Sequence, residues 1–274
     1  MTVPDLVVLR DVSYTYNAGT ALMRPALSSI NLSVPSGVTM AVVGATASGK
    51  STLLQILAGL IDVGEGTVTM AAAAPYGAAA AMVFQRAEAQ LYCPTVREDV
   101  GVGPTCLGLT SSLVERRVDE ALRLVGMDPR EFGSRNPHRL SLGEQRRVAL
   151  AGVLAVEPRL LVLDEVGSGL DAGVRGDIML SLREWREEIA GRSLVFSTHV
   201  LEEAADADRV VLLSAGRLLA EGSPESVLGD AATLELAGLE PTLSTRVALA
   251  LGADLPCPVD ARSLRMWLQG RVQT

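Results

Sequence analysis

The chain has 274 residues, 48% of them hydrophobic, which is enough to bury the core of one large domain with an appendage or of two small domains. Its formal net charge of −8 argues against a nucleic-acid-binding protein and against docking to anionic lipid through a basic patch. Its three cysteines form no CxxC pair, so we expect a reducing environment and no structural zinc.

The first part of the chain is expected to hold strands that lead into a tight loop. Residues 6–9 form an apolar run typical of a strand, and residues 13–16 either continue it or form a second strand. Residues 38–43 form a short apolar run that ends at a glycine, as a buried strand does. Residues 50–58 then follow as a helix.

Lys50 is the only lysine among 24 basic residues, and it stands in a motif that binds phosphate chains. The segment matches G-x-x-x-x-G-K-[ST] between a predicted strand and a predicted helix, as the motif requires. Loop N–H groups favour phosphate, and we expect Lys50 to reach the β and γ phosphates of a nucleoside triphosphate and Ser51 to hold Mg²⁺. Lysine suits a tight loop because it is a compact charge on a flexible stem, whereas arginine is a planar fork. The expected nucleotide-binding residues are Gly44, Ala45, Thr46, Ala47, Ser48, Gly49, Lys50, Ser51 and Thr52.

Residues 66–85 carry no charge over the nominal length of a membrane span. The stretch is mostly alanine, with a proline and a glycine in its middle, and alanine supplies little transfer energy. We therefore expect two short strands around a turn instead of a membrane helix. The segment that follows, about residues 86–156, is rich in predicted helices and is expected to form a subdomain inserted into the main domain.

Two capping boxes predict where helices start in this segment. Ser112 pairs with Glu115, and Ser141 pairs with Glu144 at the start of a helix that runs to about residue 155. The second box leaves two explanations open. Ser141 and Glu144 either cap their own helix, or Ser141 and the N–H groups of the helix N-terminus bind a phosphate.

Two adjacent carboxylates, Asp164 and Glu165, end a buried apolar strand expected at residues 160–163. In open α/β sheets, ligands bind at the carboxyl ends of strands. We therefore expect Asp164 to orient the Mg²⁺ shell and Glu165 to polarise the attacking water. An exposed pair in a strand-to-loop turn is the plainer alternative, and the phosphate-binding motif favours the catalytic interpretation.

The last part of the chain continues the alternation of helices and strands. Asp171 is expected to cap a helix that reaches about residue 189, and strands follow at residues 194–196 and 210–213. Ala215 and Gly216 indicate a hairpin turn into a last short strand. His199 follows one of these strands, where a histidine can contact a γ-phosphate, although a lone histidine is more often an ordinary surface residue.

This order of elements indicates an α/β fold with a largely parallel central sheet. We expect a main domain over residues 1–229 that contains the helical subdomain at about 86–156. Residues 230–274 are expected to form a small helical extension, because prolines there break up the pattern.

Taken together, these segments resemble the ATP-binding-cassette (ABC) ATPases. The resemblance covers about residues 5–225 and implies a P-loop NTPase with an N-terminal antiparallel β subdomain. It implies that Gln85 is the glutamine of the Q-loop, a catalytic residue and Mg²⁺ ligand beside Ser51 and Asp164. It also implies that Tyr16 stacks on adenine and that His199 is the switch histidine. The residues that match the signature and the D-loop are Ser141, Leu142, Gly143 and Glu144, and Asp171.

Residues 82–104 and 147–155 are similar to those of the energy-coupling factor (ECF) importers, and residues 239–246 look like a degenerate copy of that group's C-terminal dimerisation extension. This resemblance implies an ATPase subunit, peripheral on the cytoplasmic face of the cell membrane, that powers import of a vitamin or transition-metal ion. An ATPase of another ABC transporter class and a soluble ABC protein acting as a nucleotide switch are the alternatives. A P-loop kinase is a further rival, against which the signature argues.

The ECF resemblance also implies partners. Two ATPase subunits would sandwich two ATP molecules, each site pairing the P-loop of one chain with the signature of the other. Residues 85–99 would grip a membrane-embedded coupling protein, and a separate membrane subunit would select the cargo; no nucleic acid is expected. Glu88, Glu98 and Asp99 either offer carboxylates to arginines of the coupling protein or form a merely solvated acidic face.

Leu142 departs from the family pattern, which has glycine at this place. Glycine allows close approach of the backbone to a phosphate, and leucine crowds it. Ala47 replaces a common glycine of the phosphate loop, but the residues for chemistry on this chain's own ATP are all present. We therefore expect an asymmetric pair with a different ATPase subunit, in which one of the two sites is impaired.

Overall fold

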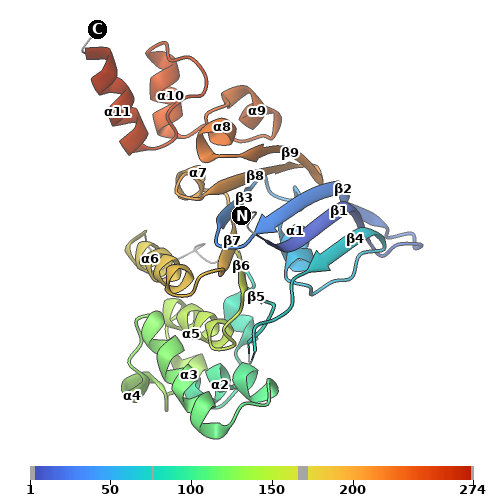
Figure 1. Cartoon of the computed structure of the whole chain (residues 1–274), viewed down its shortest axis with the longest axis vertical. Coiled ribbons are helices and arrows are strands. Elements are labelled where there is room, and N and C mark those ends of the chain that lie inside the picture. The colour runs from blue at the N-terminus through green and yellow to red at the C-terminus, as the bar shows by residue number, and fades with distance from the viewer. Residues whose placement is uncertain (1–3, 76, 166–171, 273–274) are drawn as a thin grey trace.

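The computed structural model describes residues 4–75, 77–165 and 172–272 and contains two β-sheets (Figure 1). The smaller, antiparallel sheet has the strand order β2-β1-β4, and the larger one has the order β5-β6-β7-β3-β8-β9. All neighbours in the larger sheet are parallel except β8 and β9. The predicted fold class is confirmed. The strands are β1 (Asp5–Tyr16), β2 (Arg24–Pro35), β3 (Thr39–Val43), β4 (Glu65–Met70), β5 (Ala80–Val83), β6 (Leu160–Asp164), β7 (Ser193–Thr198), β8 (Arg209–Ser214) and β9 (Arg217–Gly222).

The central strands form because they are short apolar runs that can be covered on both faces. Every residue of β3, β6 and β7 is buried, as is typical of parallel strands between two layers. The turn between β8 and β9 has φ of 47° at Ala215 and 75° at Gly216. Positive φ at both central residues is the requirement of a tight hairpin turn, so the hairpin prediction is confirmed.

In the antiparallel sheet, residues 13–16 continue β1, which was one of the two predicted alternatives. β2 was not predicted, because Ser29 has φ of 49° and lies at an irregularity in the pairing with β1, which breaks the apolar alternation. The two strands predicted within residues 66–85 exist as β4 and β5, but they belong to different sheets instead of meeting around a turn.

The helices between β5 and β6 lie at one end of the molecule, and those after β9 lie at the opposite end (Figure 1). Among the described residues, no helix is long and apolar enough to cross a membrane. The helices are α1 (Lys50–Leu57), η1 (Ala87–Gln90), α2 (Val96–Cys106), α3 (Ser111–Leu124), α4 (Pro129–Phe132), η2 (Pro137–Arg139), α5 (Leu142–Leu154), α6 (Ala172–Glu188), α7 (Leu201–Ala204), α8 (Pro224–Leu228), α9 (Ala231–Leu236), α10 (Leu243–Ala250) and α11 (Ala261–Val272).

One of the two predicted capping boxes is present. At the start of α5, Ser141 Oγ accepts from Glu144 N at 3.3 Å and donates to Glu144 Oε2 at 2.7 Å. The prediction for Ser112 was wrong, because α3 begins at Ser111 and the carboxylate of Glu115 binds Arg97 at 2.5 Å instead.

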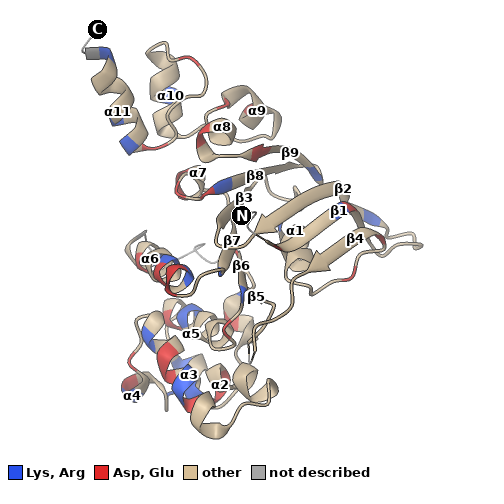
Figure 2. Ribbon diagram, in the orientation of Figure 1, with Lys and Arg blue, Asp and Glu red and all other residues tan. Residues whose placement is uncertain are grey.

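A capping box that the sequence analysis overlooked opens α2. Thr95 Oγ1 accepts from Glu98 N at 3.2 Å, and Glu98 Oε2 accepts from Thr95 N at 3.1 Å. The neighbouring Asp99 accepts from Tyr92 N and Cys93 N at 2.8 and 2.7 Å. Both carboxylates therefore have local structural roles at the start of α2. The acids and arginines of α3 are also interspersed, so this helix does not carry charges of a single sign (Figure 2).

Ser141→Ala is expected to destabilise the start of α5 by about 1 kcal/mol above pH 4.5, because it removes the hydrogen bonds that Ser141 Oγ makes in the capping box. Those bonds from Ser141 lower the pKa of Glu144 from its ordinary value of 4.5. A lowered carboxyl pKa stabilises the fold above the unfolded value and loses that contribution as the pH falls below it. Urea unfolding at several pH values should therefore show that the difference in unfolding free energy between the wild type and Ser141→Ala becomes smaller under acid conditions. An equal difference at all pH values would contradict the prediction.

Candidate functional site

The order of the larger sheet brings four predicted segments to one edge. The loop at residues 44–49 follows β3, Asp164 ends β6 with Glu165 next, His199 follows β7, and Gln85 lies just beyond β5. These four strands are neighbours and parallel, so their carboxyl ends meet at the same edge. The chemistry-bearing residues are thus gathered by the strand order, although they lie far apart in the sequence.

The loop after β3 requires glycine at two positions. A Cβ on Gly44 would stand 2.4 Å from the carbonyl oxygen of Leu213, and a Cβ on Gly49 would stand 2.8 Å from that of Ala26. Gly49 also has φ of 107°, which L side chains rarely adopt. Ala47 adopts φ of 63° without being glycine, a conformation that costs about 1 kcal/mol. The loop is therefore tightly packed and locally strained.

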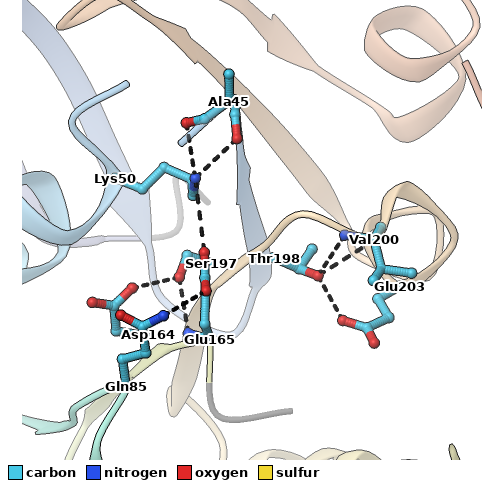
Figure 3. Close-up of polar contacts among 10 residues, drawn as sticks. Ala45, Lys50, Gln85, Asp164, Glu165, Ser197, Thr198, Val200 and Glu203 are labelled. Atoms are coloured by element: carbon cyan, nitrogen blue, oxygen red, sulfur yellow. Dashed lines mark hydrogen bonds and ion pairs between the residues drawn. The ribbon is translucent and has the colours of Figure 1, made fainter. Parts of the chain in front are cut away.

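Lys50 is the first residue of α1 and is 7% exposed. Its Nζ donates to the carbonyl oxygens of Gly44 at 2.9 Å and Ala45 at 3.1 Å, and it lies 3.9 Å from Glu165 Oε1 (Figure 3). Burial lowers the pKa of Lys50, and the carboxylates of Glu165 and Asp164 oppose that shift. The ammonium therefore lies between the phosphate loop and the carboxylate pair.

Glu165 is held in an unusual backbone conformation, with φ of 48°. Its backbone N–H donates to Ser197 Oγ at 3.0 Å, and its Oε2 accepts from Gln85 Nε2 at 2.9 Å. Strained residues of this kind persist where the surroundings determine them, and they gather at functional sites. The geometry directs the carboxylate of Glu165 toward Lys50 and Gln85 (Figure 3).

Asp164 is buried, and its Oδ1 accepts from Ser197 Oγ at 2.7 Å. One hydroxyl of β7 thus holds both members of the carboxylate pair, because it donates to Asp164 and accepts from the N–H of Glu165. The sequence analysis missed this role of Ser197. A run of polar residues at the end of a buried strand was the available signal, but the partner strand could not be known without the sheet order.

A cavity of about 340 Å³ lies between the phosphate loop and the antiparallel sheet. Tyr16 borders it, and its hydroxyl is 3.1 Å from Thr52 Oγ1. Arg24 also borders it and pairs with Tyr16 across β1 and β2; the sequence analysis missed Arg24 because it did not predict β2. The cavity is lined by Tyr16, Arg24, Pro25, Ala26, Thr46, Ala47, Gly49, Lys50, Ser51, Thr52, Gln85 and Glu165.

The residues around this cavity fit a nucleoside triphosphate with Mg²⁺. The first turn of α1 leaves backbone N–H groups without helical partners, and Lys50 supplies the positive charge. Ser48 Oγ is buried and has no hydrogen-bond partner within the described ranges. Mg²⁺ prefers oxygen ligands and keeps several waters, so the Ser51 hydroxyl and the Gln85 amide suit it. This holds although the described residues contain no cluster of three His, Cys, Asp or Glu side chains.

Two predicted segments do not border the cavity, and a third cannot be compared with it. His199 is exposed in the bend after β7. The segment from Ser141 to Glu144 lies at the start of α5, with Leu142 49% exposed. Asp171 belongs to residues 166–171, which lie outside the described ranges. Within those ranges, the predicted signature segment is not part of the cavity lining.

Comparison with known proteins identifies similar chains. Residues 27–168 match the family model of the ABC transporter domain. The chain is 41% identical over 244 residues to the energy-coupling factor transporter ATP-binding protein EcfA of Methanothermobacter thermautotrophicus, covering 85% of this chain and 76% of that protein. It is 38% identical over 236 residues to EcfA2 of Streptococcus sanguinis, covering 82% and 84%.

Solved structures agree with these matches. CbiO1 from Clostridium perfringens, part of the ABC transporter complex cbiONQ, aligns with a TM-score of 0.71 and 27% identity over 91% of this chain and 99% of that one. A dimeric ATP-binding cassette in a post-hydrolysis state, bound to ADP and Pi, aligns with a TM-score of 0.70 and 27% identity over 80% of this chain and 98% of that one.

Proposed function

Because this chain belongs to the ABC transporter ATP-binding family and is an ATPase of the energy-coupling factor type, we propose that it powers an importer for a vitamin or a transition-metal ion. The observation that carries the proposal is the meeting of Lys50, Gln85 and Glu165 at one cavity beside a phosphate loop. Relatives that share 35–41% identity bear the name of energy-coupling factor ATP-binding proteins, which supports this importer class.

The chain's own residues divide the work of hydrolysis. The ammonium of Lys50 would exchange its carbonyl partners for β- and γ-phosphate oxygens, and Tyr16 would stack on adenine. Glu165 would accept a hydrogen bond from the attacking water and orient it toward the γ-phosphorus, and Gln85 would hold that carboxylate in place. Bound Mg²⁺, held by the Ser51 hydroxyl and Gln85 with Asp164 behind them, would neutralise charge on the phosphates.

We further propose that turnover needs a second, non-identical ATPase subunit. The signature segment from Ser141 to Glu144 lies away from this chain's cavity, so it is free to face a partner's ATP. His199 and Asp171 would complete the site at the γ-phosphate and at the subunit boundary. The C-terminal segment, residues 230–274, is proposed as a dimerisation element, with exposed apolar side chains at Leu243 and Met266.

We propose that this ATPase subunit is peripheral and lies on the cytoplasmic face of the cell membrane, where it binds its membrane partners. Residues 85–99 would bind a membrane-embedded coupling protein, and a separate membrane subunit would bind the cargo. Glu98 and Asp99 hold local structure at the start of α2, so any contact with arginines of the coupling protein would use their remaining carboxylate oxygens and Glu88.

Leu142→Gly is expected to raise ATP hydrolysis by the assembled complex about twofold, because the partner's site then also turns over. Leu142 is the first residue of α5 and is half-exposed, so glycine opens the backbone at that place with a loss of helix stability of about 1 kcal/mol. The matched control is Leu142→Val, which keeps a branched side chain and should give no gain. An unchanged rate in Leu142→Gly, or full activity of a homodimer, would contradict the asymmetric arrangement.

The importer itself is tested by transport. Vesicles containing the complex purified from native membranes should accumulate one solute from a panel of labelled vitamins and divalent transition-metal ions, and only with ATP on the side of the ATPase. A chain that stays in the soluble fraction, without membrane proteins, would indicate a nucleotide switch instead. ATP-driven movement of a different class of solute would indicate another ABC transporter class.

A further inference from the structure

Two adjacent hydroxyls at the end of β7 reach in different directions (Figure 3). Ser197 binds the carboxylate pair through Asp164 Oδ1 and Glu165 N. Thr198 instead donates from Oγ1 to Glu203 Oε2 at 2.6 Å, on α7. Successive side chains of a strand point to opposite faces, so the two residues immediately before His199 are tethered on both sides of the sheet.

Thr198 also holds the backbone turn around His199 through a second hydrogen bond. Thr198 Oγ1 accepts from Val200 N at 3.0 Å, which brackets His199 between two residues joined by one hydroxyl. Such turns of Ser and Thr hold local backbone in place of a regular ladder. His199 itself is exposed, so its position depends on this backbone more than on packing around its ring.

Glu203 joins this turn to α6. Its Oε1 lies 2.5 Å from Arg175 Nη1, while its Oε2 accepts from Thr198. Both side chains of the ion pair are about a quarter exposed, at 28% and 24%, so water screens the pair only in part. Arg175 stands on α6, four residues after the predicted D-loop residue Asp171. One carboxylate therefore bridges the backbone that carries His199 and the helix that follows the D-loop segment.

We propose that Glu203 and Thr198 are positioning residues for His199 in ATP hydrolysis. The inference rests on the proposed role of His199 at the γ-phosphate. Neither Thr198 nor Glu203 borders the nucleotide cavity, so their effect falls on the placement of the histidine and not on the affinity for ATP. The shared carboxylate also makes the position of His199 depend on that of α6.

The test measures steady-state ATP hydrolysis by the complex purified with its native partners. Thr198→Val removes the hydroxyl at nearly constant volume, and Glu203→Ala removes the bridge. Each is expected to lower kcat between about tenfold and a hundredfold with the KM for ATP unchanged, since misplacing a reacting group by about 1 Å has effects of that size. Thr198→Ser keeps the oxygen and should retain near-normal kcat, and thermal unfolding of each variant verifies that the fold is kept.

A second arm asks whether the effect passes through His199. His199→Ala should lower kcat by itself, and adding Thr198→Val to it should cause no further loss. Additive losses would overturn the inference, as would normal kcat in Thr198→Val or equal impairment in Thr198→Ser. If His199→Ala alone leaves hydrolysis unchanged, the proposed role of His199 fails and the inference fails with it. If His199→Ala is inactive while Thr198→Val is normal, only the inference fails.

Discussion

Lys50→Arg is expected to lower ATP hydrolysis at least about a hundredfold, although it conserves the charge. The ammonium lies within 3.1 Å of the carbonyl oxygens of Gly44 and Ala45, in a loop where Gly44 and Gly49 have no room for a Cβ. A guanidinium is planar and wider, so it cannot occupy this position without moving the loop. Phosphate release by the complex, with the change in this subunit alone, measures the effect.

The matched control makes the reverse change elsewhere in the chain. Apart from Lys50, all Lys and Arg positions are arginine. Arg217→Lys changes an exposed residue of β9 in the opposite direction and should leave the rate unchanged. Near-normal turnover in Lys50→Arg would show that the ammonium does not bind the phosphates, and the whole account of the site would fall with it.

Glu165→Gln is expected to lower hydrolysis by about a hundredfold or more and to leave ATP binding intact. Glutamine keeps the size of the side chain and its acceptor oxygen, but it lacks the charge that polarises water. Equilibrium binding of a fluorescent ATP analogue separates the two effects, because Lys50 and the loop are unchanged.

Gln85→Ala is a useful comparison, because it leaves the carboxylate of Glu165 in place and removes the amide that donates to it at 2.9 Å. It should reduce hydrolysis less than Glu165→Gln does. If Glu165→Gln binds and hydrolyses ATP as the wild type does, Glu165 is not the catalytic carboxylate.

The central sheet was predictable because its strands are short apolar runs that end at glycine or at charged residues. β6 ends at Asp164 and β3 ends just before Gly44, two residues that the motifs had already marked. β2 was not predictable in the same way, since its irregular pairing at Ser29 breaks the alternation of apolar residues. Because β2 was not predicted, Arg24 at its start was also missed, although it borders the cavity.

The capping boxes show how local and tertiary forces compete. Ser141 and Glu144 bond to each other, so the local box forms. Glu115 lies within reach of Arg97 from another helix, and this charged partner replaces the predicted bond to Ser112. A sequence shows that a box is possible, but it does not show which side chains approach from elsewhere.

The supporting residues of the site required the strand order. Ser197 and Thr198 have roles only because β7 lies between β6 and β3 and is followed by α7. Their partners Asp164 and Glu203 are 33 and 5 positions away in the sequence. No spacing rule connects a hydroxyl to carboxylates at such separations.

The central claim is that ATP held at Lys50 is turned over only with the signature of a second subunit. Its most direct test is the rate of ATP hydrolysis per chain, measured for the isolated chain over a wide range of concentrations and for the complex purified from membranes. The account predicts a negligible rate for the dilute isolated chain and a high rate in the complex, lost again in Glu165→Gln. A rate per chain that stays constant down to the lowest concentration, and that equals the rate in the complex, would contradict it.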